Sequence, residues 1–112
     1  MKIVMLERNS VGTDISVDAI GRYGEVTSYA NTTGEGAAGR IADADSVIAN
    51  KTPLNESTLK DAGNVKLICL FATGYDNVDL SYCKSRGIKV ANVVNYSTDA
   101  VAQHTFALCL YL

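Results

Sequence analysis

The sequence contains no tryptophan, one proline, one histidine and three cysteines. The cysteines, at positions 69, 83 and 109, are odd in number, widely spaced and without a CxxC pair. Structural zinc takes four closely arranged nitrogen or sulfur ligands, and small secreted scaffolds pair their cysteines in disulfides. We therefore expect buried, reduced thiols, no metal site and a reducing, cytoplasmic environment.

The sequence also lacks a charge excess and a long apolar run. Its 10 basic and 12 acidic residues are mixed along the chain, which gives a formal charge of −2 and no basic stripe. Nucleic acid and anionic membranes are therefore not expected as partners. No apolar run reaches the roughly 18 residues that span a bilayer, and Glu7 and Arg8 come too early for a signal peptide. With 112 residues, 47% of them apolar, the chain can build one hydrophobic core.

Short apolar or β-branched runs alternate with helical stretches along the chain. The expected strands cover residues 2–6, 25–30, 46–50, 65–72 and 89–94. The expected helices cover residues 14–22, 35–44, 56–62, 79–86 and 98–112. This alternation implies parallel pairing through right-handed crossovers, and hence a doubly wound α/β fold with a five-stranded parallel sheet. The flavodoxin-like order 2-1-3-4-5 suits five strands.

Residues Gly34 to Gly39 spell GEGAAG, which has the GxGxxG form of a dinucleotide-binding loop. A genuine fingerprint follows an apolar strand directly and opens a long helix with an apolar face. Here the polar residues 31–33 come first, and the expected helix is short and rich in glycine. We interpret the segment as a turn that enters a weak helix.

The loop 72–77 leaves the most apolar, and therefore central, strand at its carboxyl edge, where ligands bind in such sheets. Gly74 would let successive N–H groups point at one spot, forming a nest for a carboxylate. The alternative is a tight turn in which Asp76 or Asn77 caps the next helix. Lys51 leaves the neighbouring strand at the same edge and either faces that anion or is solvated. Residues 10–13 are either a fragment of a flavin-phosphate loop or a helix cap.

Three segments resemble the D-isomer-specific 2-hydroxyacid dehydrogenases, especially their glycerate dehydrogenase or hydroxypyruvate reductase branch. They are NKTPLNESTL (50–59), LICLFATGYDNVDLSYCKSRGIKVANV (67–93) and NYSTDAVAQHTFALCLYL (95–112). Residues 1–49 fit only the general βα pattern. The resemblance implies a substrate-binding lobe over residues 1–97 and an apolar helix, 98–112, that leads into a nucleotide-binding lobe.

The resemblance also implies roles for single residues. The backbone amides of Thr73 and Gly74 would hold the substrate carboxylate, and Val101 would pack near the nicotinamide. The substrate-side residues implied are Asn50, Lys51, Thr73, Gly74, Tyr75 and Tyr96. The intact enzyme would transfer a hydride between NAD(P) and a small 2-hydroxy or 2-oxo acid. Its dinucleotide loop and its catalytic Arg, acidic residue and His would follow later in the chain, so we expect this chain to be inactive alone and to bind acids weakly.

The last expected helix, residues 98–112, is apolar nearly all round, which is typical of a buried helix. In the family the second lobe covers it. Here we expect the helix either to fold back into the place of the fifth helix, which the family supplies from the far end of its chain, or to pack in a homodimer. The alternative functions are a self-standing folding and dimerisation module without a ligand, and a flavin-mononucleotide binder.

Overall fold

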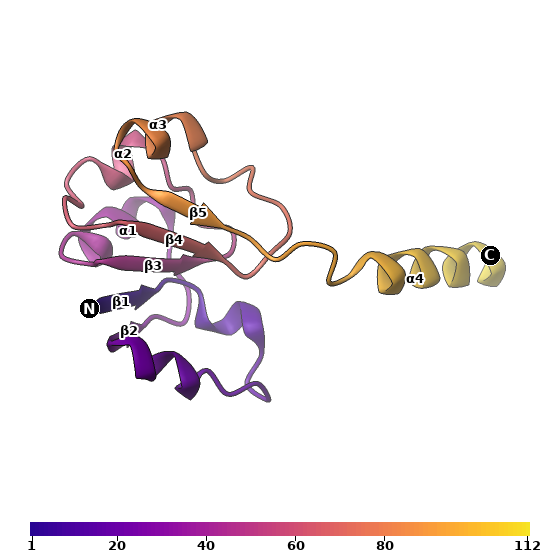
Figure 1. Ribbon diagram of the computed structural model, residues 1–112. Coiled ribbons are helices and arrows are strands. Elements are labelled where there is room, and N and C mark those ends of the chain that lie inside the picture. The colour runs from indigo at the N-terminus through magenta and orange to yellow at the C-terminus, as the bar shows by residue number, and fades with distance from the viewer.

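The computed structural model describes all residues from 1 to 112 and contains one five-stranded sheet (Figure 1). The spatial order is β2-β1-β3-β4-β5 and every pairing is parallel, which confirms the predicted topology. Each strand is shorter than predicted, since pairing stops where the loops begin. The strands are β1 (Lys2–Met5), β2 (Glu25–Ser28), β3 (Ser46–Ala49), β4 (Leu67–Leu70) and β5 (Lys89–Ala91).

Three short α-helices cover one face of the sheet. They are α1 (Gly34–Ile41), α2 (Glu56–Leu59) and α3 (Leu80–Ser85). The core beneath them combines inward residues of the strands with residues of the helices, as alternation along a strand requires. Its strand members are Val4, Leu6, Val47, Ala49, Ile68 and Leu70, and its helix members include Ile41, Leu59 and Cys83.

Two of these helices begin at side-chain caps. The Asn55 side chain accepts the N–H of Ser57 at 3.0 Å, and the Thr58 hydroxyl accepts the N–H of Asn55 at 2.9 Å, which completes a capping box. Asp79 caps α3 by accepting the N–H of Tyr82 at 2.9 Å. Asn55 directly precedes the helix expected over residues 56–62, which is the position of an N-cap, and asparagine is among the residues preferred there. The cap of α3 is Asp79, rather than Asp76 or Asn77, because the helix begins only at Leu80.

The opposite face of the sheet is covered only in part, by the 3-10 helix η2 (Asp18–Tyr23). The predicted α-helix over 14–22 is wrong: a second 3-10 helix, η1 (Arg8–Val11), comes earlier, and residues 12–17 form a loop. The Arg8 guanidinium holds this loop, since it donates to the carbonyl oxygens of Gly12 and Ile15 at 2.6 Å each. β-Branched residues and Gly21 are weak helix formers and do not compete with these contacts.

An apolar groove of about 340 Å³ remains open on this second face. It runs along the amino-terminal halves of the strands, beside η2. Its lining residues are Met1, Ile3, Ile20, Tyr23, Ser46, Ile48, Leu67 and Cys69. The helices of this chain therefore complete only one of the two outer layers.

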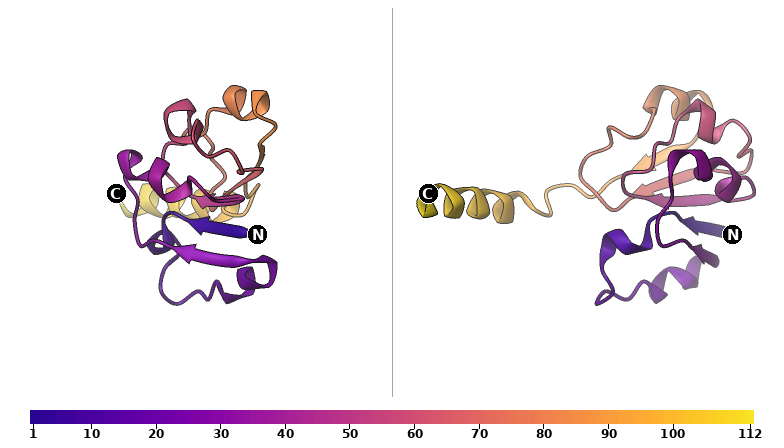
Figure 2. Two further views of the ribbon diagram at one scale, coloured as in Figure 1. Left: turned by 90° about the vertical axis from the view of Figure 1, so that its left-hand side faces the viewer. Right: turned by 180° about the vertical axis from the view of Figure 1, so that it is seen from behind.

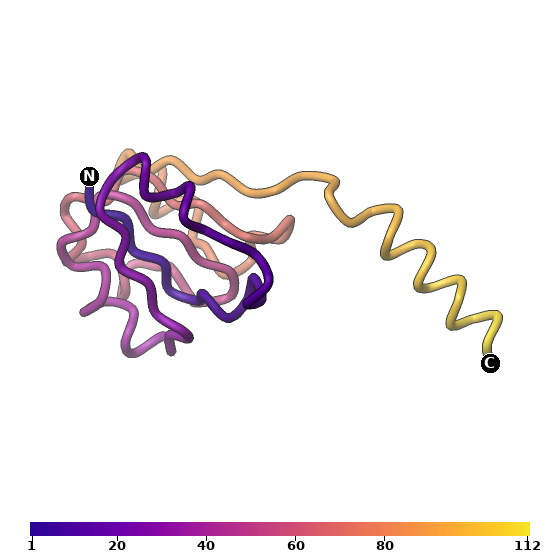
Figure 3. Tube along the Cα trace, turned by 90° about the horizontal axis from the view of Figure 1, so that it is seen from below, coloured from indigo at the N-terminus to yellow at the C-terminus, as the bar shows by residue number.

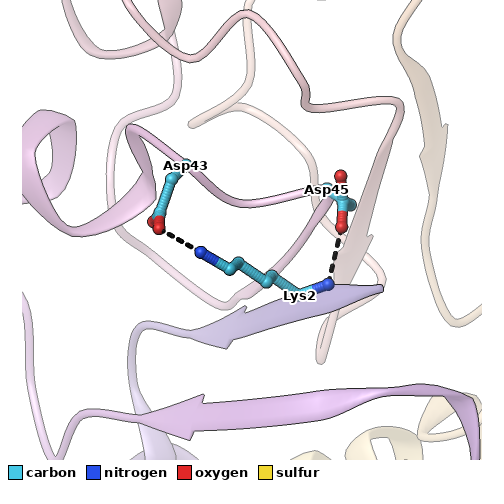
Figure 4. A network of polar contacts seen from close by, with 3 residues as sticks. All are labelled: Lys2, Asp43 and Asp45. Carbon is cyan, nitrogen blue, oxygen red and sulfur yellow. Dashed lines mark hydrogen bonds and ion pairs between the residues drawn. The ribbon is translucent and has the colours of Figure 1, made fainter.

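Lys2 fastens the start of β1 to the turn before β3 (Figure 4). Its ammonium group donates to the carboxylate of Asp43 at 2.6 Å, and its backbone N–H donates to the carboxylate of Asp45 at 2.6 Å. The hydrogen bond and charge of Asp43 raise the pKa of Lys2, and those of Lys2 lower the pKa of Asp43. Both side chains are exposed, so this pair fixes the strand ends without forming part of a site.

The last helix, α4 (Thr98–Tyr111), stands away from the rest of the chain (Figures 2 and 3). All its residues are exposed, including Phe106 at 70% and Leu110 at 86%. The longest dimension is 51 Å, and the radius of gyration is 15.7 Å against about 13 Å for a compact domain of this length. Of the two alternatives expected for this helix, the structure contradicts the first, in which it folds back into the place of the fifth helix, because an extended segment directs it away from the body after β5.

Candidate functional site

A pocket of about 270 Å³ lies at the carboxyl edge of the sheet, between the loops that follow β3 and β4. This is the edge at which doubly wound sheets bind ligands. Three of the predicted site residues meet here. The lining residues are Asn50, Lys51, Ala72, Gly74, Asp76 and Asn77.

The loop after β4 carries unused hydrogen-bond donors. The backbone N–H groups of Thr73, Gly74 and Tyr75 donate to no group of the chain. The loop is held instead from the side of β5: the Thr73 hydroxyl donates to the carbonyl of Val93 at 2.8 Å, and the Asn92 side chain donates to the carbonyl of Thr73 at 2.7 Å. The anchoring contacts thus leave the amide donors available to a ligand.

The reason predicted for Gly74 is wrong. Its φ lies outside the left-handed region, which only Gly12, Gly87 and Asn95 adopt. A Cβ placed on Gly74 would meet nothing within 4 Å. Neither the backbone turn nor packing inside this chain requires a glycine here, so what its absent side chain provides is open approach to the backbone.

Glu7, which the sequence did not single out, organises the other side of the pocket. One carboxylate oxygen accepts the backbone N–H groups of Asn50, Lys51 and Thr52 at 2.6, 2.9 and 3.1 Å. Partial burial acts to raise the pKa of Glu7, but these backbone hydrogen bonds outweigh it and the pKa is lowered. The amides of this loop are therefore already occupied by an internal anion.

Lys51 brings a positive charge to the pocket and Asp76 a negative one. The Lys51 side chain is exposed and forms no ion pair, since the chain's one ion pair joins Lys2 to Asp43. Asp76 lines the same pocket and offsets that charge. Attraction of an anion therefore depends on the free amides of residues 73–75 as well as on Lys51.

A second pocket, of about 320 Å³, lies beside the first at the same edge. Phe71 lines it and the next residue, Ala72, lines the first pocket, so the two flank the end of β4. Tyr96 lies in this second pocket, apart from Asn50, Lys51 and Gly74. The lining residues are Ser10, Val11, Phe71, Val93 and Tyr96.

The remaining predicted site residues are more dispersed. Thr73 and Tyr75 belong to the loop of the first pocket but do not line it. Val101 lies on α4, is 60% exposed and lines neither pocket. GEGAAG, residues 34–39, lies entirely within α1, and a Cβ placed on Gly34 would come within 3.8 Å of the Pro53 ring. A helix interior offers no phosphate-binding loop, so this segment does not form the dinucleotide-binding loop that its GxGxxG form suggests.

The three thiols are all free but not equally buried. Cys83 is buried and Cys69 half-buried, and burial raises the pKa of each. Cys109 is exposed on α4, contrary to the prediction of three buried thiols, because that helix has no covering layer. Separately, no helix of the chain combines the length and apolar character needed to cross a membrane.

Comparison with known proteins agrees with this fold. Residues 3–108 match the family model of the D-isomer specific 2-hydroxyacid dehydrogenase catalytic domain. The hydroxypyruvate reductase of Blautia hydrogenotrophica is 36% identical over 98% of this chain, and the glycerate dehydrogenase of Methylorubrum extorquens is 36% identical over 99%. The D-lactate dehydrogenase of Aquifex aeolicus, solved with NAD and lactic acid, superimposes on 100% of this chain with a TM-score of 0.82 and 25% identity.

The matches cover only part of each relative. The chain spans 35% of the length of those two curated relatives and 33% of the Aquifex structure. The matched part is the region that the family model describes as the catalytic domain. The chain belongs to the D-isomer specific 2-hydroxyacid dehydrogenases and represents about a third of such an enzyme.

Proposed function

We propose that this chain is the substrate-binding lobe of an NAD(P)-dependent 2-hydroxyacid dehydrogenase and that its first pocket takes the carboxylate of a small 2-hydroxy or 2-oxo acid. The observation that carries the proposal is the run of free backbone N–H groups at residues 73–75 in the loop after β4, where Gly74 lines the first pocket and Thr73 and Tyr75 flank it. The names of the relatives, hydroxypyruvate reductase and glycerate dehydrogenase, support the class of acid.

The geometry supports a carboxylate as the ligand of these amides. Hydrogen bonds from N–H groups to an ionised oxygen are roughly twice as strong as those between neutral groups. Gly74 leaves the loop backbone open to close approach, and Lys51 adds an exposed positive charge beside it. The negative charge of Asp76 works against a second anionic group, which favours a small acid with a single carboxylate.

The chain holds a substrate but does not supply the redox partner. In the parent enzyme a nicotinamide accepts or donates the hydride, and the GEGAAG segment of this chain forms part of α1 and not a loop that would hold such a cofactor. Its pockets contain no histidine, since the one histidine, His104, lies on α4. We therefore expect no turnover of hydroxypyruvate with NADH by the chain alone. A rate above the buffer background would contradict this part of the proposal.

Lys51 provides a direct test of the pocket. We expect Lys51→Ala to weaken binding of oxamate, a stable analogue of a 2-oxo acid, about threefold to tenfold in calorimetric titration. The matched control is Lys60→Ala, because Lys60 is also an exposed lysine but lies at the end of α2, outside both pockets. Equal loss in both variants would indicate general charge attraction instead of a pocket.

We also propose that two copies of the 112-residue chain associate through α4. The observation that favours this is the complete exposure of an apolar helix, in which each large side chain left in water forgoes roughly 1.5–3 kcal/mol. A helix of 14 residues is moreover marginal in water without packing. Sedimentation equilibrium is expected to give a dimer. A monomer at all concentrations, with rapid hydrogen exchange over residues 98–111, contradicts the proposal.

A further inference from the structure

Glu7 follows the first strand, and its carboxylate accepts hydrogen bonds from several neighbouring backbone N–H groups of the loop after β3. The three N–H groups that donate to it belong to consecutive residues, 50–52. The backbone N–H of Lys51 also donates to the second carboxylate oxygen at 3.1 Å. Such charge-assisted bonds are strong, and their loss leaves several donors unpaired at once. The conformation of the loop after β3 thus depends on a charge that the end of β1 supplies.

The same loop is joined to the one after β4. The Asn77 side chain donates to the carbonyl of Thr52 at 2.9 Å, and the Leu54 N–H donates to the carbonyl of Asn77 at 2.8 Å. Leu54 and Val78 also form an isolated parallel bridge. Contacts therefore run from Glu7, through residues 50–54, to Asn77 and the loop that carries the free amides of residues 73–75.

No cation neutralises Glu7. The neighbouring Arg8 directs its guanidinium to the carbonyls of Gly12 and Ile15, and Lys51 forms no ion pair. The carboxylates on the elements around the pocket are those of Asp76, in its lining, and Asp79, which caps α3. The backbone N–H groups of residues 50–52, with a further contribution from the Thr52 hydroxyl, hold the charge of Glu7, so its ionisation is coupled directly to the shape of the loop.

We propose that Glu7 is a positioning residue of the acid-binding pocket: its carboxylate fixes residues 50–54 and, through Asn77, the loop 72–77 that receives the substrate carboxylate. The ligand in this statement rests on the function proposed above, whereas the coupling between the two loops does not. The ionised form is the one that orders the pocket, so protonation of Glu7 is expected to loosen both loops together.

The coupling is tested first without ligand, by following backbone and side-chain amide resonances of the labelled chain as the pH is lowered. All variants carry Asp76→Asn, which removes the other carboxylate of the pocket. The amides of residues 50–52 are expected to show a transition with a pKa below the ordinary glutamate value of 4.5, shared by Gly74 and the Asn77 side chain. Glu7→Gln should remove this shared transition, and Glu25→Gln, on the exposed edge strand, should retain it.

The proposal is overturned if the resonances of residues 50–52 shift with pH while those of Gly74 and the Asn77 side chain do not change over the same pH range. This comparison needs no substitution at Glu7, so a failure of Glu7→Gln to fold does not prevent the decision. Oxamate then separates the two proposals. If it moves no resonance of residues 73–75 in the unsubstituted chain, the proposed function fails while the pH coupling still decides the role of Glu7. If it binds, Glu7→Gln is expected to raise its Kd about tenfold at neutral pH, and an unchanged Kd contradicts the positioning role.

Discussion

Asn77 and Thr52 join the two loops of the candidate acid-binding pocket through one hydrogen bond, from the Asn77 side chain to the Thr52 carbonyl, 2.9 Å long. Thr52 is buried and Asn77 half-buried, so the bond is partly protected from water. It links loops that follow two adjacent parallel strands, β3 and β4. The width of the pocket is therefore set by contacts within this chain, before any second lobe is considered.

Replacement of Asn77 should open this link. We expect Asn77→Ala to lower the free energy of unfolding by about 1 kcal/mol, the usual net value of one such hydrogen bond, and to weaken oxamate binding. Urea denaturation measures the first effect and calorimetry the second. Asn64→Ala is the control, since Asn64 is exposed in a turn and forms no hydrogen bond within the chain. Equal effects of the two substitutions would show that the Asn77 bond is unimportant.

The charge of Glu7 should make stability depend on pH. Its pKa is lowered in the folded chain, so the folded state favours the ionised form. The resulting stabilisation is fully present above the ordinary value of 4.5 and is lost as the pH falls from there through the folded-state pKa. We expect Glu7→Gln to be less stable than the unsubstituted chain at neutral pH and to lose less stability on acidification. Parallel stability curves from urea denaturation between about pH 7 and about pH 3 would contradict this.

The side-chain cap of α2 should stabilise the part of the core to which this helix contributes Leu59. Asn55→Ala removes the acceptor for the Ser57 N–H, and we expect a loss of about 1 kcal/mol in the free energy of unfolding. Asn55→Asp keeps a side-chain oxygen at that position and should restore most of the loss. Thermal denaturation of the two variants provides the measurement, and equal destabilisation by both would count against a capping role.

Self-association through α4 should respond to a charge on its apolar surface. Phe106 is 70% exposed in the single chain, so Phe106→Lys has no packing to disturb there. In a dimer that buries this side chain, a lysine should raise the dissociation constant at least about tenfold. His104→Lys, two residues away on another side of the helix, is the control for added charge. Sedimentation profiles that are the same for both variants and the unsubstituted chain would exclude Phe106 from the interface.

Much of the fold could be predicted because the buried strands are short, strongly apolar runs separated by clear turn residues. Asn55 and Gly87 also mark helix ends whose chemistry is local, and Gly87 has the expected positive φ of 68°. The prediction of a helix over 14–22 was wrong because the conformation of residues 12–17 depends on Arg8. The Arg8 guanidinium donates to the carbonyls of Gly12 and Ile15 and holds this segment as a loop. Apolar spacing at Ile15, Val17 and Ile20 carries no information about such a competing contact.

The candidate site was predictable only in its location. The loops after β3 and β4 could be placed at one edge of the sheet, and Asn50, Lys51 and Gly74 do line one pocket. Glu7 was not found because its partners are backbone amides more than forty positions away, which no side-chain motif records. The signal that could have found it is the position of Glu7, an acidic residue directly after a buried strand and at the same sheet edge as the loop after β3. The exposure of α4 could not be predicted, because apolar composition alone does not say what covers a helix.

The central claim is that the free amides of residues 73–75 receive the carboxylate of a small 2-oxo acid. The most direct measurement is an amide chemical-shift map of the labelled chain during titration with oxamate. The account predicts saturable shifts concentrated at Thr73, Gly74 and Tyr75, with smaller ones at Asn50 and Lys51, and none in the apolar groove beside η2. Shifts that do not saturate, or that avoid residues 73–75, would contradict it.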